Sequence, residues 1–149
     1  MMFRGHFEHA IDAKGRTSIP ARFRDALGAG ETRLIVTPNL FDPCLDVLPM
    51  RVWEELEEKI AGLPQFDPHV VAFRRRYVSA AVECEIDKTG RVLIPPNLRE
   101  HAGLHKEVLW AGMGRTAELW ARERFKAAGQ MSEAELLAFK TAIAEQFRL

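Results

Sequence analysis

Apolar and polar residues alternate near the N-terminus with the two-residue period of a β-strand. Phe7, His9 and Ile11 fall on one face, and charged or small residues fall on the other. Asp12–Gly15 then has the composition of a tight turn, because aspartate accepts backbone hydrogen bonds and glycine tolerates a positive φ. Since Arg16–Ile19 returns as a second strand, the pattern predicts a β-hairpin.

A short helix, two more strands and two longer helices are predicted to follow this hairpin. Pro20 suits the first position of a helix, where a missing amide hydrogen costs nothing. Residues 34–37 and 45–48 are apolar, strand-like runs separated by prolines. Residues 52–63 carry an apolar stripe at helical spacing, and Asp67–Pro68 is a helix cap followed by a first-turn proline.

Three consecutive arginines, Arg74–Arg76, lie in the helix that begins near Asp67. Three successive helical residues point in different directions, so they cannot form one flat basic patch. We therefore expect salt bridges or subunit contacts at this run.

The stretch Ile11–Arg24 returns as Ile86–Arg99 without a gap, and seven of the fourteen aligned positions are identical. Such a match indicates an internal duplication, and two copies favour two similar units packed about a pseudo-two-fold axis. Each half contains a hairpin, a short helix, a strand pair and a longer helix, which predicts an α+β fold. We expect the first unit to span residues 2–80 and the second to span 81–149.

The last stretch of the chain predicts a capped helix. Ser132 and Glu135 have the spacing of a capping box. The helix that follows has one apolar face, which continues to the C-terminus. The residues of this face are Leu136, Phe139, Ile143 and Phe147.

The composition is that of a globular protein, with 47% hydrophobic and 28% charged residues. No apolar run approaches a membrane span and no signal-peptide core is present, so we expect a cytoplasmic protein without membrane contact. Cys44 and Cys84 lack metal-knuckle spacing, and we expect reduced, buried thiols. The formal net charge of zero argues against a generic nucleic-acid coat.

Two aspartates related by a pseudo-two-fold axis invite comparison with the paired carboxylates of aspartic proteases. Those sites need a small hydroxyl residue and a glycine after the aspartate, whereas Ala13 follows Asp12 and Lys88 follows Asp87. Nearby cations would also stabilise both charged carboxylates and prevent proton sharing. No Ser-His-Asp signature, P-loop or dinucleotide glycine pattern is present, so we expect neither an enzyme nor a cofactor.

His101 and His105 have the i, i+4 spacing that brings two side chains to one face of a helix. Gly103 lies between them, and no glutamate follows His101 as the zinc-binding His-Glu-x-x-His motif requires. We interpret both as surface histidines and expect no metal site.

The cations of the repeated turn favour DNA binding. Lys14 and Arg16 lie on the first turn, Lys88 and Arg91 lie on the second, and Arg4 is near in sequence. An arginine on a rigid hairpin can contact guanine bidentately in the major groove, and a lysine can neutralise phosphate. We therefore interpret these five residues as candidate DNA contacts.

The arginines also have a purely structural interpretation, in which Arg16 and Arg91 only pair with aspartates and lock the turns. The two roles are compatible, because an aspartate that orients an arginine supports its contact with DNA. The residues that we expect to orient the hairpins are Asp12, Gly15, Asp87 and Gly90.

Several motifs outside and within the turns are specific enough to compare with a known family. They are the doubled Asp-x-x-x-Arg at Asp12/Arg16 and Asp87/Arg91, the Gly-Arg-x-x-Ile-Pro continuations, Leu98–Glu100, Lys106–Val108 and Glu118–Trp120. With these motifs the chain resembles the MraZ family of bacterial transcriptional regulators, which are built from two AbrB-like swapped-hairpin units. The resemblance covers nearly the whole chain, from Met2–Gly5 to the last helix.

This resemblance implies interleaved units that form an AbrB-like swapped-hairpin, double-psi-like barrel, with additional helices after each unit. It also implies subunits assembled in a closed ring. The implied function is repression of a cell-division and cell-wall gene cluster by a nucleoid-associated protein that binds direct repeats in the promoter. The residues that the resemblance assigns to DNA binding are Asp12, Lys14, Arg16, Asp87 and Arg91.

The chain departs from the family pattern at Trp110 and Ala117, which are unusual in their strands, and at Thr89, which stands where the first unit has Lys14. The DNA role of the second unit therefore has less support. Two other classes of function stay open. A ring-forming protein scaffold without specific DNA binding would tolerate Arg16→Ala, and a small hydrolase would lose activity in Asp12→Asn while keeping any affinity for DNA.

Overall fold

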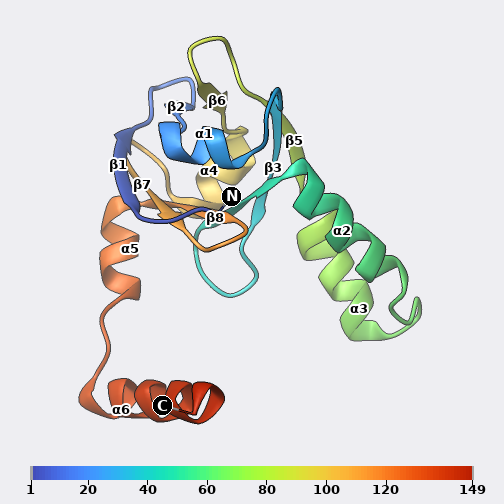
Figure 1. Ribbon diagram of the computed structural model, residues 1–149, viewed down its shortest axis with the longest axis vertical. Helices are drawn as coiled ribbons and strands as arrows, with labels where there is room; N and C mark the ends of the chain where they lie inside the picture. The colour runs from blue at the N-terminus through green and yellow to red at the C-terminus, as the bar shows by residue number, and fades with distance from the viewer. Residues whose placement is uncertain (1, 149) are drawn as a thin grey trace.

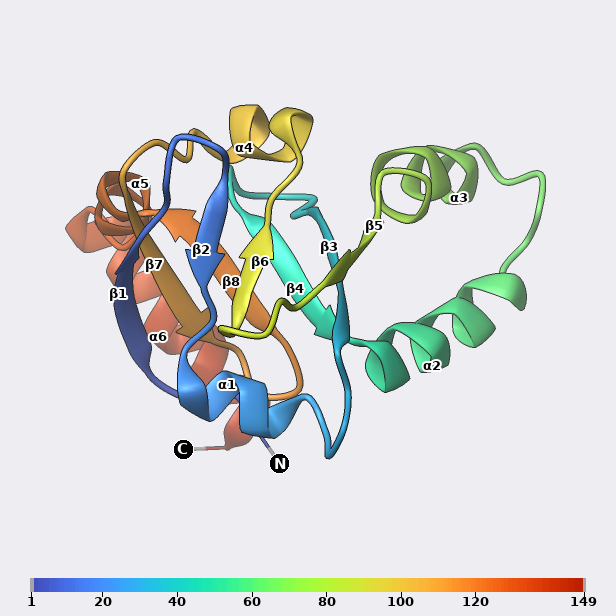
Figure 2. The ribbon, with the colours of Figure 1, turned by 90° about the horizontal axis from the view of Figure 1, so that it is seen from above.

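A computed structural model describes residues 2–148. It contains a six-stranded sheet in the order β1-β7-β8-β4-β3-β5 and a two-stranded ribbon of β2 and β6 (Figure 1, Figure 2). The strands are β1 (His6–Ala10), β2 (Arg16–Ser18), β3 (Arg33–Pro38), β4 (Leu45–Pro49), β5 (Val82–Glu85), β6 (Arg91–Leu93), β7 (Glu107–Gly112) and β8 (Ala117–Ala121). The helices are α1 (Ala21–Ala26), α2 (Met50–Ala61), α3 (Pro68–Phe73), the π-helical turn η1 (Arg74–Val78), α4 (Pro96–Ala102), α5 (Arg122–Ala128) and α6 (Glu133–Phe147).

Strands from the two sequence repeats interleave. β1 pairs with β7, β3 pairs with β5 and β2 pairs with β6, so each of these antiparallel pairs joins one half of the chain to the other. At the centre of the large sheet, Asp46 of β4 lies opposite Glu118 of β8. In the ribbon, Thr17 lies opposite Val92, its equivalent in the repeat. The strand order therefore has the pseudo-two-fold symmetry that the duplication predicts.

The predicted hairpin is confirmed at its turn, but its two strands pair with other partners. β1 lies in the large sheet and β2 lies in the ribbon, and one bridge between Ile11 and Thr17 joins the two strands. The equivalent bridge in the second half joins Ile86 and Val92. A single hairpin is marginal in water, whereas strands exchanged between halves can cover one shared core. Burial of that core therefore decides which strands pair.

The main core lies between the large sheet, the ribbon and helices α1 and α4. Both repeats contribute to it, and Phe23, Val92, Leu98 and Trp110 are each 1% exposed. A smaller cluster around Trp53 lies on the opposite face of the sheet, beneath α2 and η1. The ribbon is thus the outer wall of the main core, which fixes its position relative to the sheet.

The ends of three helices have recognisable signals, and those of α3 and α6 are as predicted. Asp67 caps α3, because its carboxylate accepts two backbone amide hydrogens of the first turn. Pro96 is the first residue of α4, and Gly103 ends that helix with a φ of 63°. Ser132 and Glu135 form the predicted capping box at the start of α6.

The apolar face of α6 does not pack against the rest of the chain. Helix α6 extends away from the sheet beyond α5 (Figure 1), and Leu136, Phe139 and Phe147 are exposed. The sequence pattern gives the face of a helix but not what covers it.

None of the helices described in residues 2–148 combines the length and the apolar character that a membrane span needs.

The arginine run lies in η1, where a π-helical turn replaces the predicted α-helix. This turn places Tyr77 in the smaller core and leaves Arg75 and Arg76 exposed. Arg74 donates a hydrogen bond to the carbonyl of Ile60 at 3.3 Å. No salt bridge to the run occurs within the described chain, so that expectation is wrong there, and subunit contacts stay a prediction.

Replacing Leu119 by alanine is expected to lower the free energy of unfolding by about 2–5 kcal/mol, because this fully buried side chain of β8 would leave a cavity. Leu137→Ala removes the same atoms from a side chain of α6 that is 67% exposed. We expect that variant to change stability by less than about 0.5 kcal/mol. Urea unfolding at equal protein concentration measures both effects, and equal losses would contradict the assignment of β8 to the core.

Candidate nucleic-acid interface

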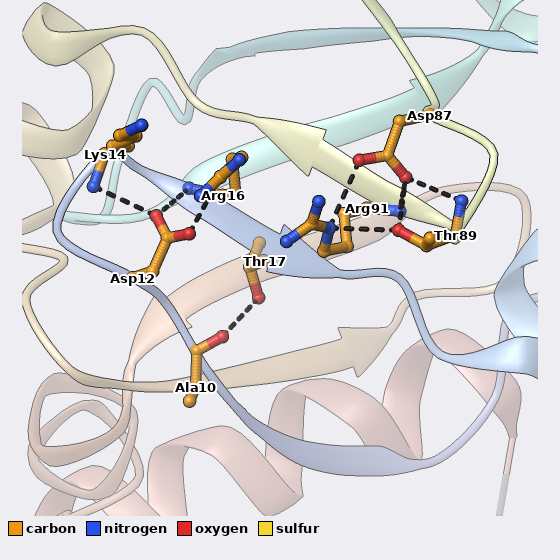
Figure 3. A network of polar contacts seen from close by, with 8 residues as sticks. All are labelled: Ala10, Asp12, Lys14, Arg16, Thr17, Asp87, Thr89 and Arg91. Carbon is orange, nitrogen blue, oxygen red and sulfur yellow. Dashed lines mark hydrogen bonds and ion pairs between the residues drawn. The ribbon is translucent and has the colours of Figure 1, made fainter.

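The carboxylate of Asp12 organises the first repeated turn. Its Oδ1 accepts the backbone amide hydrogens of Lys14 at 3.0 Å and Arg16 at 2.9 Å. Its Oδ2 accepts a hydrogen bond from Nε of Arg16 at 2.8 Å (Figure 3). The two terminal nitrogens of the Arg16 guanidinium have no partner in residues 2–148. The aspartate therefore orients this arginine and leaves its terminal nitrogens available.

The second turn has the same arrangement with one additional acceptor. Oδ1 of Asp87 accepts the amide hydrogens of Thr89 and Arg91, both at 2.9 Å, and the Thr89 hydroxyl at 2.7 Å. Nε of Arg91 donates to Oδ2 of Asp87 at 3.2 Å and to Oγ1 of Thr89 at 3.0 Å (Figure 3). Thr89 thus lacks the positive charge of Lys14 and instead accepts an additional hydrogen bond from Arg91.

Both turn carboxylates have a lowered pKa. The pKa of Asp12 falls from 3.8 to about 2, mainly because the backbone amide of Arg16 donates to it, with a further effect of the Arg16 side chain. The pKa of Asp87 also falls to about 2, mainly through the amide of Arg91 and then the hydroxyl of Thr89. Two carboxylates that each stay charged near neutral pH cannot share a proton as in an aspartic protease.

Each turn is also held by the opposite repeat. The carbonyl of Gly15 accepts the amide hydrogen of Ile94 at 2.8 Å, and the carbonyl of Gly90 accepts that of Ile19 at 2.9 Å. The φ angles of Gly15 and Gly90 are 96° and 81°, which side chains other than glycine rarely adopt. Both glycines therefore adopt the left-handed backbone conformation of these turns.

Two further arginines cover these glycines. A Cβ on Gly15 would lie 2.6 Å from Nε of Arg99, and a Cβ on Gly90 would collide with the guanidinium of Arg24. Nε of Arg99 also donates to the carbonyl of Ile94 at 3.0 Å. Sequence reasoning missed this role, although Arg24 and Arg99 are the last identical pair of the repeated stretch. The repeat of this arginine was a visible signal in the sequence, but its contact lies in the opposite repeat and cannot be inferred from neighbouring residues.

The ribbon of β2 and β6 has one buried face and one outer face. Thr17 and Val92 are buried against the main core, and side chains alternate along a strand, so their neighbours point outward. Arg16 and Arg91 therefore lie on the same outer surface, on neighbouring strands (Figure 3). We call this surface the ribbon face, and its residues are Arg16, Ser18, Arg91 and Leu93.

The predicted lysines and Arg4 lie in different places. Lys14 and Lys88 are exposed in the turns before β2 and β6, and because these strands are antiparallel, the lysines lie at opposite ends of the ribbon. Arg4 is exposed but precedes β1, whereas the first turn follows that strand. An extended strand of five residues spans roughly 15 Å, so Arg4 does not join the cations of the first turn.

The histidines and cysteines considered as metal ligands differ in their burial. His101 and His105 are exposed, and Gly103 ends α4 between them. Cys44 and Cys84 are free and buried, as expected. Burial raises the pKa of the Cys84 thiol to about 11 and also raises the pKa of Cys44, so both stay protonated near neutral pH.

The described residues contain one group of possible ligands, in which atoms of Cys44, Asp46 and Glu118 lie within 4.8 Å of one another. The side-chain nitrogen of Asn39 donates to Asp46 at 2.8 Å and to Glu118 at 3.4 Å. Tyr77 donates to the other oxygen of Asp46 at 2.7 Å. These donors satisfy the carboxylates, so the group is a hydrogen-bonded network at the pseudo-two-fold axis.

Comparison with known families matches residues 2–76 and 78–146 to the family described as "MraZ protein, putative antitoxin-like". The chain belongs to the MraZ family. The "Transcriptional regulator MraZ" of Heliobacterium modesticaldum is 48% identical over 124 residues, which is 83% of this chain and 84% of the relative. The same-named protein of Desulforamulus reducens is 46% identical over 133 residues, 89% of this chain and 91% of the relative.

Membership of the MraZ family confirms the resemblance deduced from the motifs. Each of the two matched segments contains one Asp-x-x-x-Arg turn, at Asp12–Arg16 and Asp87–Arg91, so the duplication consists of two MraZ units in one α+β fold. The curated relatives are named transcriptional regulators, and the family is not one of enzymes.

In an NMR titration, we expect the carboxyl group of Asp12 to titrate near pH 2. A lowered pKa in the folded chain means that the carboxylate stabilises folding above about pH 4, and that this stabilisation is lost as the pH falls toward 2. Arg16→Ala should raise the pKa of Asp12 only part of the way, because the backbone amides of Lys14 and residue 16 still donate. A full return to 3.8 in this variant would show that the ion pair, and not the turn, lowers the pKa.

Proposed function

We propose that this MraZ-family chain is a sequence-specific DNA-binding repressor of a cell-division and cell-wall gene cluster, acting on direct repeats in the promoter. Relatives named transcriptional regulators support a regulatory role, and the ribbon face supports double-stranded DNA as the partner. The proposed DNA contacts are Lys14, Arg16, Lys88 and Arg91, with Arg4 outside the ribbon. The residues that orient the turns are Asp12, Gly15, Asp87 and Gly90.

The observation that carries the proposal is the state of Arg16. Its backbone and its Nε are both fixed by Asp12, while its terminal nitrogens are without a partner in the described chain. A two-stranded ribbon fits the major groove, and an arginine with two available nitrogens can contact O6 and N7 of guanine. Because the side chain is already oriented, less conformational entropy is lost on binding.

Several ribbons in one assembly would answer the objection from net charge. A neutral subunit with a few basic side chains binds DNA weakly by itself. In a closed ring of subunits, repeated sites on one DNA molecule would be bound at a high effective concentration. We include this homo-oligomeric ring in the proposal, and its target is then a series of spaced repeats.

Finer features of the fold belong to the same proposal. The exchanged strands are consistent with an AbrB-like swapped-hairpin, double-psi-like barrel. We propose units at residues 2–80 and 81–149, of which residue 149 lies outside the described part of the chain. A regulator of this kind would be found in the cytoplasm, associated with the nucleoid.

Fluorescence anisotropy at near-physiological salt tests the function on DNA from upstream of the protein's own gene and on a shuffled sequence. We expect the wild type to prefer the native DNA. Arg16→Ala should weaken that binding by about 1–3 kcal/mol, the usual value of a bidentate contact to a base. Lys59→Ala removes one positive charge from an exposed position on α2 and should bind as the wild type does.

The folded state and the assembly of each variant are checked by circular dichroism and light scattering. Equal binding of the wild type to both DNAs, or to neither, would contradict the proposed function. It would favour the ring-forming scaffold instead. Equal effects of Arg16→Ala and Lys59→Ala would show that total charge, and not the ribbon face, determines the affinity.

A further inference from the structure

The ribbon face is chemically uneven, although the fold around it is symmetric. Leu93 of the second repeat occupies the position that Ser18 has in the first. Leu93 lies directly opposite Arg16, whereas Ser18 lies directly opposite Arg91. The leucine is 54% exposed, and the other three residues of the ribbon face are polar. A large apolar side chain thus lies beside Arg16, whose Nε bonds Asp12 alone, whereas Nε of Arg91 bonds both Asp87 and Thr89.

Single exposed leucines are common on protein surfaces, but the place of this one is unusual. In the described chain, Leu93 is the one exposed large apolar side chain that lies within a β-strand. The others lie in α6, in loops or near the N-terminus, as Phe41, Phe66 and Met113 illustrate. An apolar group on this strand therefore calls for a contact specific to the ribbon.

We propose that Leu93 contacts the 5-methyl group of a thymine next to the base that Arg16 contacts, and thereby determines sequence preference at that position. This inference rests on the proposed function, because it requires the ribbon face to enter the major groove. Thymine is the base that presents a methyl group there, and apolar side chains recognise that group.

The dimensions of the ribbon suit such a contact. Cβ atoms of cross-strand partners lie about 4.5–5.5 Å apart, and successive nucleotides rise by about 3.4 Å. Side chains of one cross-strand pair, such as Arg16 and Leu93, can therefore reach neighbouring base pairs.

A consequence of this contact is that the two ends of the ribbon prefer different bases, so the ribbon binds DNA in one orientation. At the other end of the ribbon, Ser18 lies opposite Arg91, and a hydroxyl can donate to or accept from different bases. One end of the ribbon would then select a thymine and the other would not. Such a module prefers an asymmetric half-site, and Leu93 gives that site its polarity.

Deoxyuridine substitution tests the contact, because it removes only the 5-methyl group from thymine. The wild type is titrated by anisotropy against its promoter fragment and against duplexes in which one thymine at a time is replaced by deoxyuridine. We expect one position per repeat at which the Kd rises about three- to fivefold, the factor for one lost apolar carbon. Leu93→Ala should bind the native fragment more weakly and show no further loss at that position.

Met113→Ala is the matched control, since this side chain is 57% exposed in the loop after β7. It should keep the wild-type response to deoxyuridine. Wild-type binding that is unchanged by every substitution would overturn the inference and leave the proposed function intact, and so would a methyl effect that persists in Leu93→Ala. A change in oligomer size of Leu93→Ala in light scattering would assign Leu93 to a subunit contact instead. Failure of the wild type to bind the promoter would count against the proposed function itself.

Discussion

The pairing of β2 with β6 across the pseudo-two-fold axis is the contact on which the rest of the structure depends. Each strand has only three residues, and such a short pair is not stable alone. It is held because Thr17 and Val92 cover the main core and because each flanking glycine carbonyl accepts an amide hydrogen from the other half. The same pairing places Arg16 and Arg91 on one surface. Loss of this pairing would therefore both expose the core and move Arg16 and Arg91 apart.

In both turns, the aspartate that folds the turn also orients the arginine that we propose as a DNA contact. Each aspartate satisfies backbone amides first and then holds the Nε of an arginine, so the structural and the DNA-binding interpretations of the motif are compatible. The repeats differ where the fold does not constrain them. Thr89 replaces Lys14, and Leu93 replaces Ser18, while the buried positions between them remain apolar or small. Such divergence on an exposed surface can change recognition without a cost in stability.

Local features of the sequence were enough to predict the duplication, the Asp-x-x-x-Arg turns and the caps of α3 and α6. They could not predict that β1 and β2 have different partners, because alternation shows which face of a strand is buried and not which strand lies beside it. The contacts of Arg24 and Arg99 were missed for the same reason, since they cross between the repeats. The apolar face of α6 was predicted correctly, but amphipathic spacing does not specify what packs against such a face, and in the structure this face is exposed.

Amide hydrogen exchange with and without promoter DNA tests most directly whether the ribbon face is the DNA-binding surface. We expect DNA to slow exchange in residues 12–18 and 87–93, which contain both turns and both ribbon strands. Helices α2 and α6 should exchange at the same rates in the free and bound states. Slower exchange confined to those helices, with the ribbon unchanged, would contradict the assignment of DNA binding to the ribbon.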